Sequence, residues 1–316
     1  LSLKAYFFIV WFMLLSIIIT MSCNNWFLIW LGLEINMMSF IAMMFSRNSL
    51  SVEMCMKYFF IQTLGSGILM MMFYSEIKWF DCTALMILSY KLGAGPFYYW
   101  FPSMCEMLSW MSCFVLMTFQ KILPLMFMSV MVNKFMWMII MISILVGAIG
   151  SMNQNKMKRM LAYSSIHHIG WILLSNFLDD MMWAIYLLMY MYMMIGIMYS
   201  LSKDNVLEIF LLKEMSSKWV FVLGMMSMGG MPPLLGFYLK WWIFFYLLKM
   251  DFSVLLMMLL MSVLMFYMYF RVVYMLVMES KVNISWNINK NNYKYMGFEM
   301  MYIMGMNTGL IMMLVV

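Results

Sequence analysis

Four charged residues lie near the middle of long apolar stretches of this chain, far from the polar residues that flank those stretches. They are one carboxylate, Glu34, and three amines, Lys91, Lys121 and Lys240. A charged side chain at the centre of a bilayer costs roughly 2.5–3.5 kcal/mol on insertion scales. Burial favours the neutral form of an amine, and a nearby carboxylate favours its charged form, so such a set can exchange protons. The four residues are therefore candidates for proton transfer inside a membrane.

His168 is a fifth candidate, in the middle of another apolar stretch. Histidine titrates closest to physiological pH and can relay a proton through either ring nitrogen. Tyr163, Ser164 and Ser165 precede it and supply hydroxyl groups that suit a hydrated relay. The alternative is a histidine that only packs in the core. His167 is expected to point to another face, so at most one of the two histidines is central.

The composition predicts that helices crossing a membrane position these residues. Of the 316 residues, 66% are hydrophobic and only 10% are charged, whereas soluble domains carry about 25% charged residues. Apolar runs recur from end to end, and no polar stretch is long enough for a separate soluble domain. We predict an all-α polytopic membrane protein with a single membrane domain over residues 1–316. Eleven spans are expected, at about residues 5–22, 25–46, 55–74, 82–101, 108–131, 135–152, 159–176, 181–201, 218–248, 252–278 and 296–316.

Two of the spans are expected to be discontinuous helices. Lys91 is followed by Leu-Gly-Ala-Gly-Pro-Phe, and Lys240 is preceded by a Gly-Gly-Met-Pro-Pro run that begins at Gly229. Glycine and proline interrupt helices, and paired interruptions at corresponding positions are typical of inverted-repeat transporters. We therefore predict a first repeat over about residues 1–131, a second over about 135–278 and a C-terminal helix over 296–316.

The basic residues predict an orientation in the membrane. With eleven spans, twelve Lys and Arg residues fall in loops on the side of the N-terminus and three on the other side. Methionine occurs 52 times, and lysine far outnumbers arginine, as expected for an AT-rich mitochondrial gene. The positive-inside rule then predicts a multi-pass protein of the inner mitochondrial membrane, with its N-terminus on the matrix side and its C-terminus on the intermembrane-space side.

The sequence offers no site for redox chemistry. The five cysteines are scattered, without the spacing of a disulfide framework, a metal site or an iron–sulfur site. We find no Gly-rich nucleotide loop and no pair of intramembrane histidines that could hold haem. We therefore expect no cofactor and no metal in this chain, and no nucleic-acid partner.

Seven motifs follow one another between about residues 20 and 275: Trp30-x-Gly-Leu-Glu-Ile-Asn36, Lys57-Tyr-Phe-x-x-Gln62, Lys91-Leu-Gly-x-x-Pro-Phe97, Gln120-Lys-x-x-Pro124, Asn153-Gln, Ala162-Tyr-Ser-Ser-Ile-x-His168-x-Gly-Trp171 and Gly229-Gly-x-Pro-Pro-x-x-Gly-Phe-x-x-Lys-Trp241. In this order they resemble the subunit 2 family of mitochondrial NADH:ubiquinone oxidoreductase, respiratory complex I. The Ser-Ser-Ile-x-His-x-Gly stretch is shared with the sister subunits 4 and 5, which are much longer.

The resemblance implies an antiporter-like fold with an inverted repeat, in which the first repeat is truncated at its N-terminus. It implies that Glu34, Lys91 and Lys121 match a glutamate–lysine–lysine proton-transfer series. It also implies that Lys240 matches the lysine toward the exit and that His168 matches the histidine of a central hydrophilic axis.

The chain departs from the family pattern at two positions. Ala42 stands where the family has proline, and Tyr98 stands where it has histidine. The second change puts a relay through the first helix break in doubt, although Tyr98 retains a hydroxyl group.

We predict a membrane-arm subunit of this enzyme that translocates protons and carries no redox centre itself. Electron transfer from NADH to ubiquinone would take place in partner subunits, which would hold the NADH, flavin, iron–sulfur clusters and ubiquinone. Expected partners are the other membrane-arm subunits, including sister subunits 4 and 5 and the small membrane subunits, and lipids such as cardiolipin. Two alternatives stay open: a stand-alone cation/proton antiporter, and a structural subunit whose charges only pair across helices.

Overall fold

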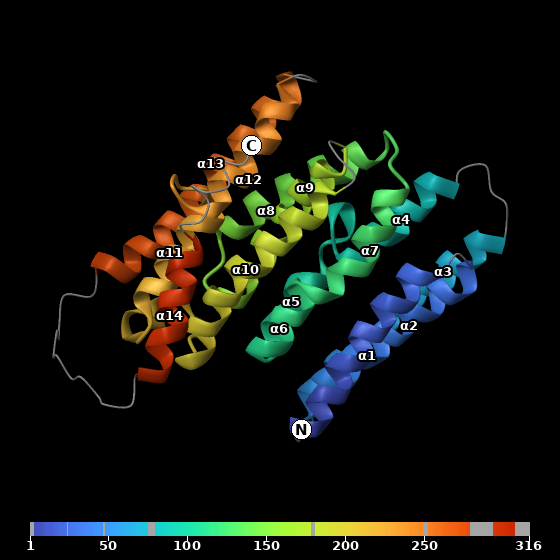
Figure 1. Cartoon of the computed structure of the whole chain (residues 1–316), viewed down its shortest axis with the longest axis horizontal. Coiled ribbons are helices and arrows are strands. Elements are labelled where there is room, and N and C mark those ends of the chain that lie inside the picture. The colour runs from blue at the N-terminus through green and yellow to red at the C-terminus, as the bar shows by residue number, and fades with distance from the viewer. Residues whose placement is uncertain are drawn as a thin grey trace. The chain divides into compact units, whose positions relative to one another are not determined.

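The computed structural model describes residues 3–23, 25–46, 48–74, 80–177, 181–248, 252–278 and 293–306 (Figure 1). Over these residues the chain forms fourteen α-helices and two short 3-10 helices, and the described part contains no β-strand. The predicted all-α class is confirmed. The chain divides into two compact units, Leu1–Ser143 and Ile144–Val316.

The first unit contains seven complete helices, a 3-10 helix and the start of an eighth helix. These are α1 (Leu3–Ser22), α2 (Trp26–Met44), α3 (Ser49–Tyr74), α4 (Phe80–Leu92), η1 (Gly95–Phe97), α5 (Trp100–Met107), α6 (Trp110–Met117), α7 (Phe119–Val130) and the beginning of α8 (Met136–Met152). Within this unit α2 packs against both α1 and α3, and α4 packs against both α3 and α7. This arrangement gathers the helices that carry Glu34, Lys91 and Lys121.

The second unit contains the remainder of α8 and the helices that follow it. These are α9 (Met157–Ser175), α10 (Met182–Lys203), the 3-10 helix η2 (Ile209–Glu214), α11 (Lys218–Gly229), α12 (Leu235–Leu247), α13 (Phe252–Met278) and α14 (Tyr293–Met306). Helix α9 is buried on nearly every face, as expected for a helix in the interior of a bundle. Residues 307–316 of the predicted C-terminal span lie outside the described residues.

Five stretches of the described chain are helical, long and apolar enough to cross a membrane: Trp26–Met44, Ser49–Tyr74, Trp110–Val130, Met182–Lys203 and Ser253–Val277. A membrane core admits helices because every backbone group bonds within its own segment. The polytopic membrane fold is confirmed, whereas the count of eleven spans and the repeat boundaries stay predictions.

The first predicted helix break is present between α4 and α5. Gly93 has a φ of +66°, a left-handed conformation that glycine adopts without strain. Its N–H donates to the Tyr90 carbonyl at 3.2 Å, and the Ala94 N–H donates to the Ser89 carbonyl at 3.0 Å. These two bonds form a Schellman motif, which satisfies carbonyls at the C-terminus of α4.

The second predicted break, between α11 and α12, begins in the same way. Gly230 has a φ of +87°. Its N–H donates to the Ser227 carbonyl, and the Met231 N–H donates to the Met226 carbonyl, both at 3.1 Å. The same terminator therefore ends the first half of each discontinuous helix.

The expected end of the fourth span was wrong, and the fifth span, whose predicted bounds of about 108–131 agree with Trp110–Val130, contains a break that was not predicted. The fourth span does not end near residue 101, because α5 continues beyond the break to Met107. The fifth span is interrupted at Thr118, whose hydroxyl donates to the Phe114 carbonyl at 2.7 Å. The Thr118 N–H turns to the Val115 carbonyl instead, at 3.3 Å. A threonine hydroxyl that takes the carbonyl of the preceding turn competes with the helix hydrogen bond. Thr63 makes the same bond to the Phe59 carbonyl within the unbroken α3, so this bond accompanies the break at Thr118 and does not by itself cause it.

Candidate functional site

Glu34 lies on α2 and is held by α3. The Ser66 hydroxyl donates a hydrogen bond to Glu34 Oε1. The other side of Glu34 lines an apolar groove between α1 and α2, together with Phe8 and Phe12. Glu34 is thus placed between a neighbouring helix and an open apolar face.

Lys91 lies in the last turn of α4 and is 7% exposed. Its side chain passes over Gly65 of α3, where an added Cβ would lie only 3.0 Å from Lys91 Cε. Glu34 is the carboxylate whose charge acts on the Lys91 ammonium group. Because Ser66 follows Gly65, one short segment of α3 contacts both members of this pair.

Lys121 lies in the first turn of α7 and is 2% exposed. Its ammonium group is 5.1 Å from the centre of the Phe101 ring, in cation–π range. Lys91 and Lys121 line the same cavity, which has a volume of about 20 Å³. That volume holds one water molecule, so one water could join the two amines.

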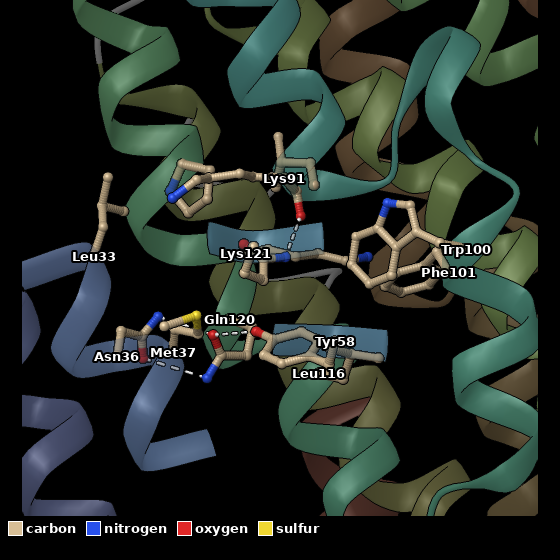
Figure 2. A pocket seen from close by; sticks show the side chains of 13 residues that line it. Leu33, Asn36, Met37, Tyr58, Lys91, Trp100, Phe101, Leu116, Gln120 and Lys121 are labelled. Carbon is tan, nitrogen blue, oxygen red and sulfur yellow. Dashed lines mark hydrogen bonds between the residues drawn. The ribbon is translucent and has the colours of Figure 1, made fainter. Parts of the chain in front are cut away.

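A network of neutral polar side chains lines the same cavity (Figure 2). Asn36 Nδ2 donates to Gln120 Oε1 at 2.9 Å, and Gln120 Nε2 donates to Asn36 Oδ1 at 3.3 Å. The Tyr58 hydroxyl donates to Gln120 Oε1 at 3.2 Å, and Gln62 Nε2 donates to the Lys91 carbonyl at 3.2 Å. The residue motifs contained all four side chains, but their spacing in sequence did not show that they would meet.

In the second unit Lys240 reaches back across the helix break. It is 5% exposed, and its ammonium group donates to the Met228 and Gly229 carbonyls, both at 3.0 Å. These carbonyls end α11, where the negative end of the helix dipole favours a cation. A cavity of about 350 Å³ adjoins Lys240, with walls that include Phe237 and Phe266.

The two histidines have different partners, as predicted from their adjacent positions. His168 Nδ1 is 3.0 Å from the Tyr186 hydroxyl, and its ring packs against Tyr190. His167 accepts a hydrogen bond at Nε2 from the Trp171 indole N–H at 3.0 Å. Its Nδ1 is 3.4 Å from the Ile144 carbonyl, so the neutral ring carries its hydrogen on Nδ1.

Sequence reasoning did not find the relation between His167 and Lys240. The charge of Lys240 acts on the His167 ring. The sequence favours His168 as the relay, and no feature of the sequence relates His167 to a lysine seventy-three positions later. Only the packing of α9 against α12 makes this relation possible.

Three buried amines beside helix breaks, with a carboxylate on the neighbouring continuous helix α2, are features of one class, namely antiporter-type transmembrane proteins. Residues 70–266 match the family described as "NADH:quinone oxidoreductase/Mrp antiporter, TM". The NADH-ubiquinone oxidoreductase chain 2 of Anopheles gambiae is 35% identical over 296 residues, which cover 87% of this chain and 86% of that protein. The chain of the same name from Locusta migratoria is 35% identical over 244 residues, covering 71% and 70%.

Solved structures share the fold at lower identity. A chain of respiratory complex I from Thermus thermophilus with bound aureothin has a TM-score of 0.76 and 22% identity, over 86% of this chain and 70% of that chain. A chain of the Mrp complex from Dietzia sp. has a TM-score of 0.73 and 16% identity, over 84% and 59%. The chain belongs to the NADH:quinone oxidoreductase/Mrp antiporter transmembrane family, among the relatives named NADH-ubiquinone oxidoreductase chain 2.

Proposed function

We propose that the chain is a membrane-arm subunit of NADH:ubiquinone oxidoreductase that translocates protons across the inner mitochondrial membrane. Its relatives named chain 2 support membership of that enzyme. The observation that carries the proton-transfer role is the convergence of Lys91 and Lys121 on one small cavity, with Glu34 in electrostatic range of Lys91. Three titratable groups from three helices are thereby grouped inside a membrane bundle.

The transfer step within the first unit follows from these positions. The Glu34 carboxylate lies in electrostatic range of the Lys91 ammonium group. A change of charge at Glu34 would alter that interaction, and Lys91 would then release its proton across the cavity to Lys121. Electron transfer in partner subunits would drive the change at Glu34.

In the second unit, we propose His168 and Lys240 as the further proton-transfer groups. Lys240 is supported by its burial at a helix break beside a cavity of about 350 Å³. His168 is supported by its hydrogen-bonding distance to the Tyr186 hydroxyl. We also propose the matrix side for the N-terminus, and partner subunits as the holders of NADH, flavin, iron–sulfur clusters and ubiquinone.

The test is a Lys121→Met substitution in the assembled enzyme, reconstituted into vesicles. We expect fewer protons pumped per electron pair at an unchanged level of assembly. Lys57→Met is the matched control, because Lys57 is an exposed lysine that pairs with Glu53 on the surface of α3. An unchanged proton-to-electron ratio in Lys121→Met would remove Lys121 from the mechanism.

The two alternatives each predict a different experimental result. A stand-alone antiporter predicts that the chain alone, in liposomes, transports cations when a pH gradient is applied. A purely structural subunit predicts that a neutral pair, such as Glu34→Gln with Lys91→Met, leaves the pumping ratio unchanged. Our proposal requires a negative result in the first experiment and a reduced ratio in the second.

A further inference from the structure

Gln120 connects two other helices to α7. Its Oε1 accepts from Asn36 on α2 at 2.9 Å and from Tyr58 on α3 at 3.2 Å, while its Nε2 donates back to Asn36 Oδ1 at 3.3 Å. An amide oxygen has two lone pairs, and both are used here. The orientation of the Gln120 side chain is therefore fixed from two directions (Figure 2).

The backbone that carries Gln120 lies in the first turn of its helix, next to a break. The interruption at Thr118 separates α6 from α7, and Gln120 is the second residue of α7. Lys121 follows it, and the Lys121 N–H makes a short-range bond to the Thr118 carbonyl at 3.1 Å. The first turn of a helix lacks the bonds to a preceding turn that hold a helix interior. Hydrogen bonds from side chains therefore contribute more to the position of the backbone here than they would in the middle of a helix.

The other half of the amide pair lies beside the carboxylate. Asn36 follows Glu34 by two residues on α2 and is 7% exposed. Residues two apart on a helix point to different faces, so Asn36 faces α7 while Glu34 bonds to Ser66. The amide pair thus ties the helix of Glu34 to the turn that carries Lys121.

We infer that Asn36 and Gln120 are positioning residues for proton transfer: their paired amides hold Lys121 at the cavity it shares with Lys91 and tie it to the helix of Glu34. Neither amide titrates, so neither carries the proton. The Tyr58 hydroxyl supports the orientation of the Gln120 amide through its hydrogen bond to Gln120 Oε1. This inference rests on the proposed function, in which Lys121 accepts a proton from Lys91.

The first test measures pumping in the assembled, reconstituted enzyme. We expect Gln120→Met and Asn36→Leu each to cause at least about half of the loss in protons per electron pair that Lys121→Met causes. The double variant should lose no more than the larger single loss, because both changes break the same pair. The exchange Asn36→Gln with Gln120→Asn keeps one long and one short amide and should recover the ratio.

A milder variant and a control complete this test. Tyr58→Phe removes one hydrogen bond but keeps the ring that packs against Phe40 at 5.0 Å, and we expect a smaller loss in the same direction. Gln154→Leu is the matched control, because the Gln154 side-chain amide donates to the nearby Gly150 carbonyl in the second unit and does not line the cavity of Lys91 and Lys121. It should pump as the unaltered enzyme does.

The second measurement is hydrogen exchange of the backbone amides in the first turn of α7, which does not depend on pumping. We expect Gln120→Met and Asn36→Leu to lose protection there, while Lys121→Met and Gln154→Leu keep it. If both amide variants pump normally while Lys121→Met does not, the inference is overturned and the proposed function stands. If Lys121→Met itself pumps normally, the proposed function fails, and the inference that the amides position Lys121 for proton transfer fails with it. Unchanged exchange in the amide variants overturns the positioning role directly.

Discussion

The two units hold their buried lysines in different ways. In the first unit Lys121 lies over an aromatic ring, in a cavity lined with neutral amide side chains. In the second unit the Lys240 ammonium group is bonded to two main-chain carbonyls at the end of α11. Lys240 therefore stabilises a helix end in addition to any role in transfer. Side chains on other helices set the surroundings of Lys121.

The comparison extends to the helix breaks that accompany these lysines. Both breaks begin with a Schellman motif at a left-handed glycine, Gly93 or Gly230. Lys91 belongs to the last turn of the first half-helix, whereas Lys240 comes from the second half-helix and reaches back. Lys91 precedes its break in the sequence and Lys240 follows its break. In both units, however, the lysine lies near the C-terminal end of the first half-helix.

The largest expected effect is on assembly of the subunit, and it comes from a glycine at the second helix break that lies against the backbone of the preceding helix. Gly236, the second residue of α12, lies so close to α11 that an added Cβ would collide with the Ser227 carbonyl oxygen. Backbone cannot move aside as a flexible side chain can, so we expect Gly236→Ala to prevent stable assembly of the subunit. Gly93→Ala should cost less, on the order of 1–2 kcal/mol of left-handed strain plus contact with the Phe101 side chain at 2.8 Å. Assembly yield and thermal unfolding of the complex measure both, and equal yields would show that the two breaks are equally tolerant.

The next effect concerns the lysines themselves. Lys240→Met leaves the Met228 and Gly229 carbonyls without their donor, and a buried unsatisfied polar group costs about 1–3 kcal/mol. We expect Lys240→Met to lower the unfolding temperature of the complex more than Lys121→Met does, although both reduce pumping. Equal unfolding temperatures would mean that Lys240 does not stabilise the end of α11.

A smaller effect separates the two histidines of the second unit. His167→Leu removes the acceptor of the buried Trp171 N–H, so we expect a loss of stability of about 1–3 kcal/mol. His168→Gln keeps a polar group near the Tyr186 hydroxyl but cannot titrate, so we expect reduced pumping with a smaller loss of stability. Thermal unfolding and the pumping ratio together distinguish them, and a reversed pattern would make His167 the relay.

The smallest expected effect on stability is at Gly65, the glycine of α3 over which the Lys91 side chain passes. An added Cβ would displace the flexible end of Lys91, while alanine in a helix is favoured over glycine by about 1 kcal/mol. We expect Gly65→Ala to leave stability within about 1 kcal/mol but to lower the pumping ratio. Gly67→Ala is the control on the same helix, since nothing lies within 4 Å of its added Cβ. If both variants pump alike, the path of Lys91 over Gly65 is unimportant.

Much of the fold could be predicted from the sequence. The low charge and long apolar runs predicted the all-helical membrane fold, and glycine and proline marked both helix breaks. The break at Thr118 was not predictable in this way, because neither glycine nor proline stands at that position, and the threonine bond found there also occurs at Thr63 in an unbroken helix. The end of α5 was misplaced because no glycine or proline marks it.

The candidate site was predictable residue by residue but not as an arrangement. Insertion cost alone singled out Glu34, Lys91, Lys121 and Lys240. It could not place Gln120 and Asn36, because neutral amides at membrane depth carry a smaller penalty and stand eighty-four positions apart. Their roles, like those of the charged residues, stay predictions until the variants are measured.

The sequence by itself determined that the chain is helical, where two helices break and that Lys91, Lys121 and Lys240 are buried. These properties depend on local composition, and each residue contributes to them whatever its distant neighbours are. The tertiary structure alone decided that Lys91 and Lys121 share one cavity and that Gln120 bonds to two other helices. It also decided that Lys240 is bonded to the end of α11. Those relations join residues that are far apart along the chain, and only the packing of one helix on another brings their atoms within bonding distance.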